Sequence, residues 1–148
     1  MIVVRPVHPE DAEAWCRIRH DFWPDGSAEE HAREIAAFFA GHGPGPLAVL
    51  VAEAAGTLLG VTELSIRPTA EGCATDRVAY LEGWYVTPGA RGRGVGAALV
   101  AAAEEWARGE GCTEMASDTP IGNEASAAAH RAVGFEDAGL VRCFRKRL

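Results

Sequence analysis

Glycines alternate with larger residues in the stretch Arg91-Gly92-Arg93-Gly94-Val95-Gly96, immediately before an alanine-rich run with helical spacing. Glycine permits a tight turn in which several backbone N–H groups point the same way, and the N-terminus of the helix adds partial positive charge. The stretch therefore predicts a loop that binds a phosphate group. A glycine-rich turn that only leads into a structural helix is the alternative.

Two common phosphate loops do not fit. A Walker loop requires GxxxxGK[ST], and no Lys-Ser or Lys-Thr follows these glycines. A dinucleotide site fits the spacing of Gly92, Gly94 and Ala97, with Asp118 about twenty residues further on. However, only 30 of the 148 residues follow Asp118, too few to complete a doubly wound sheet. The preceding strand also contains Glu82 and alternates in character, unlike the apolar first strand of that fold.

Composition narrows the class of ligand. The formal charge of −7 argues against nucleic acid and suits a cationic ligand, and 48% hydrophobic residues allow one domain with a real core. Cys16, Cys73, Cys112 and Cys143 lie far apart, so no metal site is expected. Because no apolar run is long enough to span a membrane and the N-terminus lacks a signal-peptide pattern, we expect a cytoplasmic protein.

The pattern of elements predicts a mixed α/β domain over residues 1–148, with parallel crossovers in its second half. Ser27 and Glu30 form a capping-box pattern at the start of the second helix. The expected strands are 1–6, Leu47–Glu53, Thr57–Arg67, 78–88, 111–118 and one or two closing strands in 134–148, and the expected helices are 8–22, 27–40, Gly94–Arg108 and 123–133.

Two motifs together resemble one superfamily. The segment Arg91–Gly96 fits the pattern [Q/R]xxGx[G/A], and 123–135, "NEASAAAHRAVGF", resembles Asn-x-x-[Ala/Ser]-x-x-x-Tyr-x-x-x-Gly-Phe, with His130 in place of tyrosine. By these motifs the chain is identified as a member of the GNAT superfamily of acyl-CoA-dependent N-acyltransferases. The resemblance implies the GNAT fold, a mixed central sheet flanked by helices, with acetyl-CoA as co-substrate and no metal.

The same resemblance assigns the residues that bind acetyl-CoA. They are Trp84, Tyr85, Val86, Arg91, Gly92, Arg93, Gly94, Val95, Gly96, Ala97 and Asn123. The backbone of residues 84–86 is expected to bind the thioester carbonyl and stabilise its developing oxyanion. Alternation along the strand directs either Trp84 or Tyr85 toward the ligand and leaves open which one.

Further segments are similar to the aminoglycoside 6′-N-acetyltransferases. They are "FWPD" (22–25), "ELSIRP" (63–68), "YLEGWYV" (80–86), "GCTEMASD" (111–118) and the second motif. The resemblance implies transfer of an acetyl group to the 6′-amine of an aminoglycoside antibiotic, which confers resistance. It also places Trp23, Glu82 and Asp118 against the antibiotic, with Asp25 as a weaker candidate.

The implied reaction is direct transfer. The amine must lose a proton to attack, and either Asp118 or Glu82 accepts it, directly or through water, or both only anchor ammonium groups. His130 occupies the position of the superfamily's tyrosine acid and is a candidate to protonate the leaving thiolate. Trp23 as a core residue, Asp118 as a turn cap and His130 as a packed histidine are the structural alternatives.

The chain departs from its relatives at two places. An aromatic residue often follows "SIRP" in relatives, and here Thr69 and Ala70 stand there. In some relatives an acid after "GF" reaches a neighbouring subunit's substrate, and here Gly139 and Leu140 stand at that place, with Glu136 close by as the candidate to bind substrate. Relatives are commonly homodimers, and the last ten residues are candidates for an exchanged or shared strand.

Two other functions compete with this interpretation. One is acetylation of another polyamine or amino sugar, and the other is a non-catalytic module that binds acyl-CoA.

Overall fold

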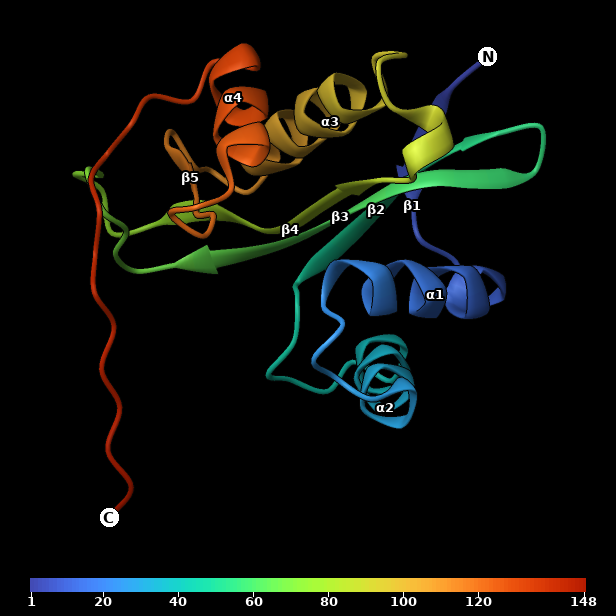
Figure 1. Ribbon diagram of the computed structural model, residues 1–148, viewed down its shortest axis with the longest axis horizontal. Coiled ribbons are helices and arrows are strands. Elements are labelled where there is room, and N and C mark those ends of the chain that lie inside the picture. The colour runs from blue at the N-terminus through green and yellow to red at the C-terminus, as the bar shows by residue number, and fades with distance from the viewer.

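The computed structural model describes residues 1–148, arranged as one mixed sheet between two helical layers. Helices α1 and α2 cover one face of the sheet, and α3 and α4 cover the other (Figure 1). The strands are β1 (Val3–Pro6), β2 (Ala48–Ala54), β3 (Thr57–Arg67), β4 (Val78–Val86) and β5 (Met115–Ser117). The helices are α1 (Ala12–Phe22), α2 (Ala28–Phe39), α3 (Val95–Gly109) and α4 (Glu124–Ala132), with 3₁₀ turns at Pro9–Asp11 and Pro88–Ala90.

The five strands lie in the order β1-β2-β3-β4-β5. The first four pair antiparallel, and β4 pairs parallel with β5, so α3 forms the crossover between two parallel strands. The mixed α/β class and the crossover in the second half of the chain are therefore confirmed. The β4–β5 pairing is short, because only Ala79–Leu81 of β4 have partners in β5.

A β-bulge interrupts β4 at Glu82. Leu81 pairs with Leu64 of β3, but the next pair joins Gly83 to Glu63, so Glu82 has no partner in the register. An extra residue shifts the alternation of side chains on the bulged strand. Leu81 and Trp84 consequently both pack on the core beneath α3, whereas Tyr85 packs on the α1 side.

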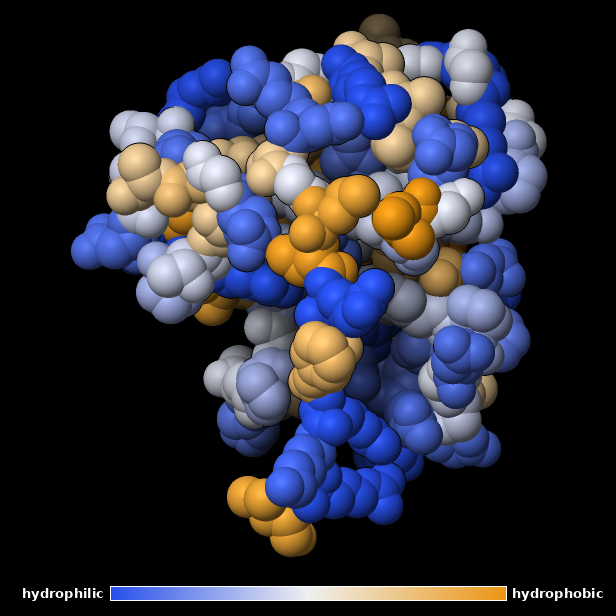
Figure 2. Space-filling model, turned by 60° about the vertical axis from the view of Figure 1, so that its left-hand side comes forward, coloured by the Kyte–Doolittle hydropathy of each residue, from blue (hydrophilic) through white to orange (hydrophobic).

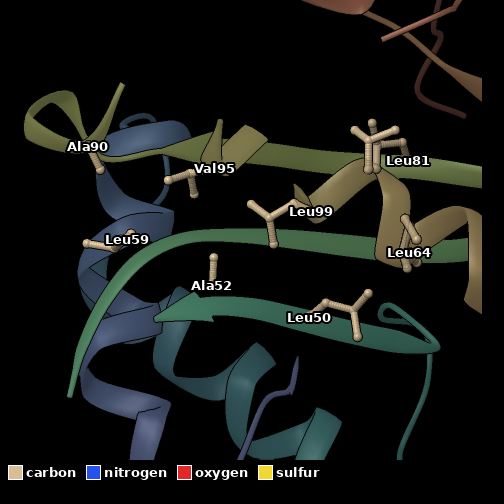
Figure 3. Close-up of a cluster of buried hydrophobic side chains, with 10 residues drawn as sticks. Leu50, Ala52, Leu59, Leu64, Leu81, Ala90, Val95 and Leu99 are labelled. Carbon is tan, nitrogen blue, oxygen red and sulfur yellow. The ribbon is translucent and has the colours of Figure 1, made fainter. Parts of the chain in front are cut away.

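The sheet separates two apolar cores. On the α3 face, Val95, Leu99, Val100 and Ala103 recur at helical spacing and pack against the strands, together with Leu50 and other residues shown in Figure 3. On the opposite face, Trp15, Ile18 and Ile35 from the first two helices pack against three valines of β2 and β3. Trp15 lies deep in this second core, with 1% of its surface exposed.

Most element boundaries agree with the sequence within two residues. Ser27 caps α2, its Oγ accepting from the N–H of Glu30 at 3.1 Å, as its sequence pattern predicts. The closing strands expected in 134–148 are wrong, because residues 135–148 form neither strand nor helix. An extended segment becomes a strand only beside a partner strand, and this tail leaves the sheet and projects from the body (Figures 1 and 2).

None of the helices combines the length and apolar character that crossing a bilayer requires. This finding concerns membrane spans alone, and the cytoplasmic location stays a prediction.

Replacing Gly60 by alanine is expected to destabilise the protein where α3 packs on β3. A Cβ there would lie 2.7 Å from the carbonyl oxygen of Tyr85 and 3.0 Å from Cδ1 of Leu99, and overpacking of this kind costs about 1–3 kcal/mol. Urea unfolding of Gly60→Ala measures the loss. Gly109→Ala is the matched control, because open space surrounds that position at the end of α3 and alanine favours a helix by up to about 1 kcal/mol. Equal stability of the two variants would contradict the close packing.

Candidate active site

The glycine-rich segment forms an open cradle of N–H groups at the start of α3. Gly92 and Gly94 have φ of 77° and 81°, values that favour glycine, and Gly94 is the N-cap of the helix. Within the protein, no acceptor takes a hydrogen bond from the N–H groups of residues 92–97. A helix N-terminus with free N–H groups is suited to bind an anion such as a pyrophosphate. The side chain of Arg91 borders this cradle, its Nε donating to the carbonyl of Val86 at 3.0 Å.

Beside the cradle, one edge of β4 has no neighbouring strand. β5 pairs with β4 only up to Leu81, so the outer edge of residues 82–86 is unpaired while the inner edge pairs with β3. Alternate residues on such an edge direct backbone N–H and C=O groups outward. These groups are available to a bound molecule, such as the thioester and pantetheine amides of an acyl-CoA.

The bulge decides how the two aromatic residues after it lie. Trp84 packs on the α3 face, where its Nε1 donates to the carbonyl of Gly96 at 3.1 Å and its ring meets His130 edge-on at 5.1 Å. Tyr85 lies on the other face, with its ring 5.8 Å from that of Phe22. Trp84 therefore faces the loop and α4, and Tyr85 faces the helical layer of α1.

On the face of α1 and α2, a cleft of about 570 Å³ is lined by Trp23, Glu63, Ser65, Glu82 and residues of α2 and the following loop. The structure thus brings the predicted residues Trp23 and Glu82 into one cleft. Trp23 is held on three sides. Nε2 of His31 lies 3.1 Å from its carbonyl oxygen, the guanidinium of Arg19 lies 5.0 Å from its ring, and Gly83 admits its ring edge where a Cβ would lie 2.9 Å away.

Glu63, at the inner end of this cleft, is buried and paired. Nε of Arg19 and Nε1 of Trp15 each donate to its Oε2 at 3.0 Å, and Arg19 also forms an ion pair with Glu34. Burial raises the pKa of Glu63, an effect that the charge of Arg19 opposes. The Arg19–Glu63 pair also holds Trp23 in place, because the guanidinium that binds Glu63 lies over the Trp23 ring.

Four side chains on β3 and β4 form a square on this face. Ser65 and Arg67 alternate along β3, as Tyr80 and Glu82 do along β4, and Ser65 is the register partner of Tyr80. Arg67 binds Glu82 through Nε at 2.9 Å and Nη2 at 2.6 Å, and this pairing raises the pKa of Arg67. The hydroxyl of Ser65 also donates to Glu82.

Asp118, just beyond β5, connects to the same square through Tyr80. The hydroxyl of Tyr80 donates to Oδ2 of Asp118 at 2.5 Å, and its ring lies 3.5 Å from the guanidinium carbon of Arg67. Burial, followed by the hydrogen bond to Asp118, raises the pKa of Tyr80. No ion pair involves Asp118, which is exposed, so its carboxylate differs from that of Glu82 in having no cationic partner.

Both ring nitrogens of His130 have partners within the protein. Nδ1 lies 2.7 Å from the carbonyl oxygen of Ser126, which only accepts, so Nδ1 carries a proton and donates it. Nε2 lies 2.8 Å from Oγ of Ser117. Ser117 Oγ also lies 3.2 Å from the carbonyl oxygen of Leu81, at the point where β4 and β5 separate.

Three of the predicted site residues lie apart from these contacts. Asn123 caps α4, its side chain accepting from the N–H of Ser126 at 3.0 Å. Asp25 is exposed in the turn between α1 and α2 and does not line the cleft. Glu136 is exposed at the start of the tail. The assignments of these residues to acetyl-CoA or to the acceptor stay predictions.

Comparisons with known proteins decide the family. Residues 12–135 match the model of the acetyltransferase (GNAT) family. The chain is 56% identical over 147 residues to the type 1 aminoglycoside N(6′)-acetyltransferase of Klebsiella aerogenes, covering 99% of this chain and 97% of that protein. The chain belongs to the aminoglycoside 6′-N-acetyltransferases of the GNAT family. A type 1 relative from Stenotrophomonas maltophilia is 40% identical over 98% of this chain and 93% of its own length.

Solved structures agree with this assignment of the aminoglycoside acetyltransferase. AAC(6′)-Iy in complex with the bisubstrate analog CoA-S-monomethyl-acetylneamine superimposes with a TM-score of 0.92 at 34% identity, covering 100% of this chain and 99% of that one. AAC(6′)-Ih from Acinetobacter baumannii gives a TM-score of 0.90 at 31% identity, over 100% and 99% of the two chains. The GNAT fold and the branch that the motifs predict are both confirmed.

Sequence reasoning missed several polar residues of the acetyltransferase's site. Arg67, Ser65 and Tyr80 contact the acidic residues directly, and Ser117 contacts His130. The sequence did contain a pattern that could have identified them. Ser65 and Arg67 in "ELSIRP", and Tyr80 and Glu82 in "YLEGWYV", are two residues apart, so each pair lies on one face of its strand. The pairing of the two strands, which aligns these residues, is information that the sequence alone did not provide.

Proposed function

We propose that this acetyltransferase moves the acetyl group of acetyl-CoA directly to the 6′-amine of an aminoglycoside, between the open edge of β4 and the cleft beside α1. One observation carries the proposal. Because of the bulge at Glu82, β4 directs Trp84 toward the phosphate cradle on one face of the sheet and Glu82 toward the cleft on the other face.

The donor side requires residues Arg91–Ala97, Asn123 and the strand residues Trp84–Val86. Free N–H groups at the start of α3 bind the pyrophosphate, as they do at other helix N-termini that bind phosphates. Outward N–H groups on the unpaired edge of β4 bind the thioester carbonyl and stabilise the negative charge that develops on its oxygen. The bound donor supplies an acetyl group activated as a thioester.

The acceptor side is acidic and has one aromatic wall. Trp23 and Glu82 line the cleft, and Glu82 anchors the aminoglycoside. Asp118 lies outside this lining, bonded to Tyr80 beside Glu82, and attracts an ammonium group. Asp118 also accepts the proton that the 6′-amine loses before attack, directly or through water, because its carboxylate has no cationic partner. The neutral amine attacks the thioester carbon, and the C–S bond breaks as the tetrahedral intermediate collapses.

A thiol-release assay with acetyl-CoA tests the proposal across aminoglycosides with and without a free 6′-amine. We expect release with compounds such as kanamycin that carry this amine, and none with compounds in which a hydroxyl replaces it. Good turnover of simple polyamines together with poor turnover of every 6′-amino compound would reject the aminoglycoside as substrate.

The same assay on Asp118→Asn tests the proton acceptor. We expect kcat to fall about a hundredfold or more, since the amide cannot accept the proton, a step that contributes 10²–10⁴-fold in general base catalysis. Asp76→Asn is the matched control, because Asp76 is an exposed aspartate in the loop between β3 and β4 and is not one of the candidate site residues. Unchanged kcat in Asp118→Asn would limit this residue to anchoring.

His130 is placed to return a proton to the leaving thiolate only through Ser117, since both of its ring nitrogens are engaged. In this relay Ser117 Oγ takes a proton from Nε2 and gives the thiolate its own proton, which in the structure is donated to the carbonyl of Leu81 at 3.2 Å. We expect Ser117→Ala and His130→Ala to lower kcat by a similar factor, about tenfold, and the double variant to lose no more than either single variant. Unchanged turnover in His130→Ala would leave this residue a packing role beside Trp84.

We also infer that the enzyme is a homodimer joined through its tail. Leu140, Val141 and Phe144 are 64–86% exposed, and one edge of β5 is free. When an extended segment of a second copy adds to the sheet, the exposed apolar side chains are buried and the open sheet edge is paired. Figure 2 shows hydrophilic and hydrophobic residues mixed along the projecting tail.

Light scattering of the full chain tests this assembly. We expect a dimer for the natural sequence and a monomer for Phe144→Asp, because a charge at that position cannot be buried in the interface without a partner. Ile121→Asp is the control, since Ile121 is also exposed, at 75%, but lies outside the tail. A monomeric natural chain, or a dimer that Phe144→Asp leaves intact, would rule out the proposed interface.

A further inference from the structure

We propose that Arg67 is a positioning residue of this enzyme, which neutralises Glu82 and fixes it as a hydrogen-bond acceptor, whereas Asp118 has no ion-pair partner. The proposal rests on the acceptor roles of Glu82 and Asp118 given above. It assigns the two carboxylates different tasks, although sequence reasoning treats them alike.

The first argument is the number of hydrogen bonds that Glu82 already accepts. A carboxylate has about four acceptor positions. Oε2 of Glu82 takes bonds from the Ser65 hydroxyl and from Nε of Arg67, and Oε1 takes one from Nη2 of Arg67. One position stays open, on Oε1. An acceptor molecule therefore meets a carboxylate of fixed direction with room for a single further donor.

The second argument is that Arg67 is itself held in place. Bidentate guanidinium–carboxylate pairs are stronger and more directional than single bonds. The Tyr80 ring adds a cation–π contact on the face of the guanidinium, 3.5 Å from its central carbon. Tyr80 is 7% exposed and lies between two neighbouring strands, so it cannot move aside easily. Two partners fixed on the sheet hold Arg67 even though its side chain is 43% exposed.

The third argument concerns charge. Arg67 compensates Glu82, Arg19 is shared between Glu63 and Glu34, and Asp118 receives only the neutral hydroxyl of Tyr80. A polycationic acceptor therefore meets a carboxylate neutralised by Arg67 at Glu82 and a carboxylate without an ion-pair partner at Asp118, at the end of β5. This arrangement selects for an ammonium group at Asp118 and for a hydroxyl or a neutral amine at Glu82. Tyr80 joins the two tasks, since its ring supports Arg67 and its hydroxyl orients Asp118.

Steady-state kinetics with kanamycin at low and high NaCl test this role. In Arg67→Gln, Glu82 is freed and its charge exposed, so we expect kcat to fall about tenfold, comparable to the loss of a charge-assisted hydrogen bond. KM at low salt should not rise, and kcat/KM should depend more steeply on salt, because the polycation is now attracted by a second charge. Arg67→Lys, which keeps the charge, should recover a large part of kcat.

Two further variants make the test decisive. Arg67→Gln combined with Glu82→Gln should be no slower than Glu82→Gln alone, since Arg67 acts through Glu82. Arg77→Gln is the control, because Arg77 pairs with Glu110 outside the cleft and its loss changes the net charge equally. The role is overturned if Arg67→Gln lowers KM at unchanged kcat, which would make Arg67 a competitor of the substrate, or if the two losses are additive. Wild-type kinetics in Glu82→Gln would instead refute the acceptor role of Glu82.

Discussion

The bulge at Glu82 is the constraint on which the site depends. It leaves one residue of β4 without a partner and resets the alternation of the strand, so Trp84 joins the core beneath α3 while Glu82 reaches the opposite face. In a regular strand these two side chains would lie on the same face. In the proposed arrangement a single strand then presents its backbone edge from Trp84 onward to the thioester and the side chain of Glu82, two residues earlier, to the acceptor.

The short pairing of β4 with β5 completes this arrangement. Because the two parallel strands separate after Leu81, the backbone of β4 is unpaired where the phosphate cradle begins, and Ser117 lies where they diverge. Unpaired backbone groups inside a sheet are costly unless a ligand or water satisfies them. The fold therefore retains an opening in the sheet that a regular parallel pairing would close, and this opening is where we propose that acyl-CoA binds.

The acidic cleft shows that total charge is a poor guide to a binding site. The chain carries a formal charge of −7, which suits a cationic substrate. Within the cleft, however, Glu63 and Glu82 each have an arginine partner, and buried carboxylates require such partners. What distinguishes Asp118 is the absence of a cation, and this difference is visible only when the contacts of each carboxylate are compared.

Local patterns determined much of this protein. Helix caps, strand alternation and the glycines before α3 depend on residues close in the chain, so the sequence was enough to predict most elements, the glycine-rich turn before α3 and the family. It also indicated Trp23, Glu82 and Asp118 through resemblance. It failed for the closing strands, because a strand needs a partner and the tail has none within the chain.

Only the tertiary structure decided how the acids are used. The bulge, the contact of Arg67 with both Glu82 and Tyr80, and the path from His130 to Ser117 depend on the register between strands. Register joins residues far apart in the chain, and a shift of one residue would reverse every face. The sequence by itself therefore determined the family and the candidate residues, and the pairing of strands decided which of the candidate acids have an arginine partner.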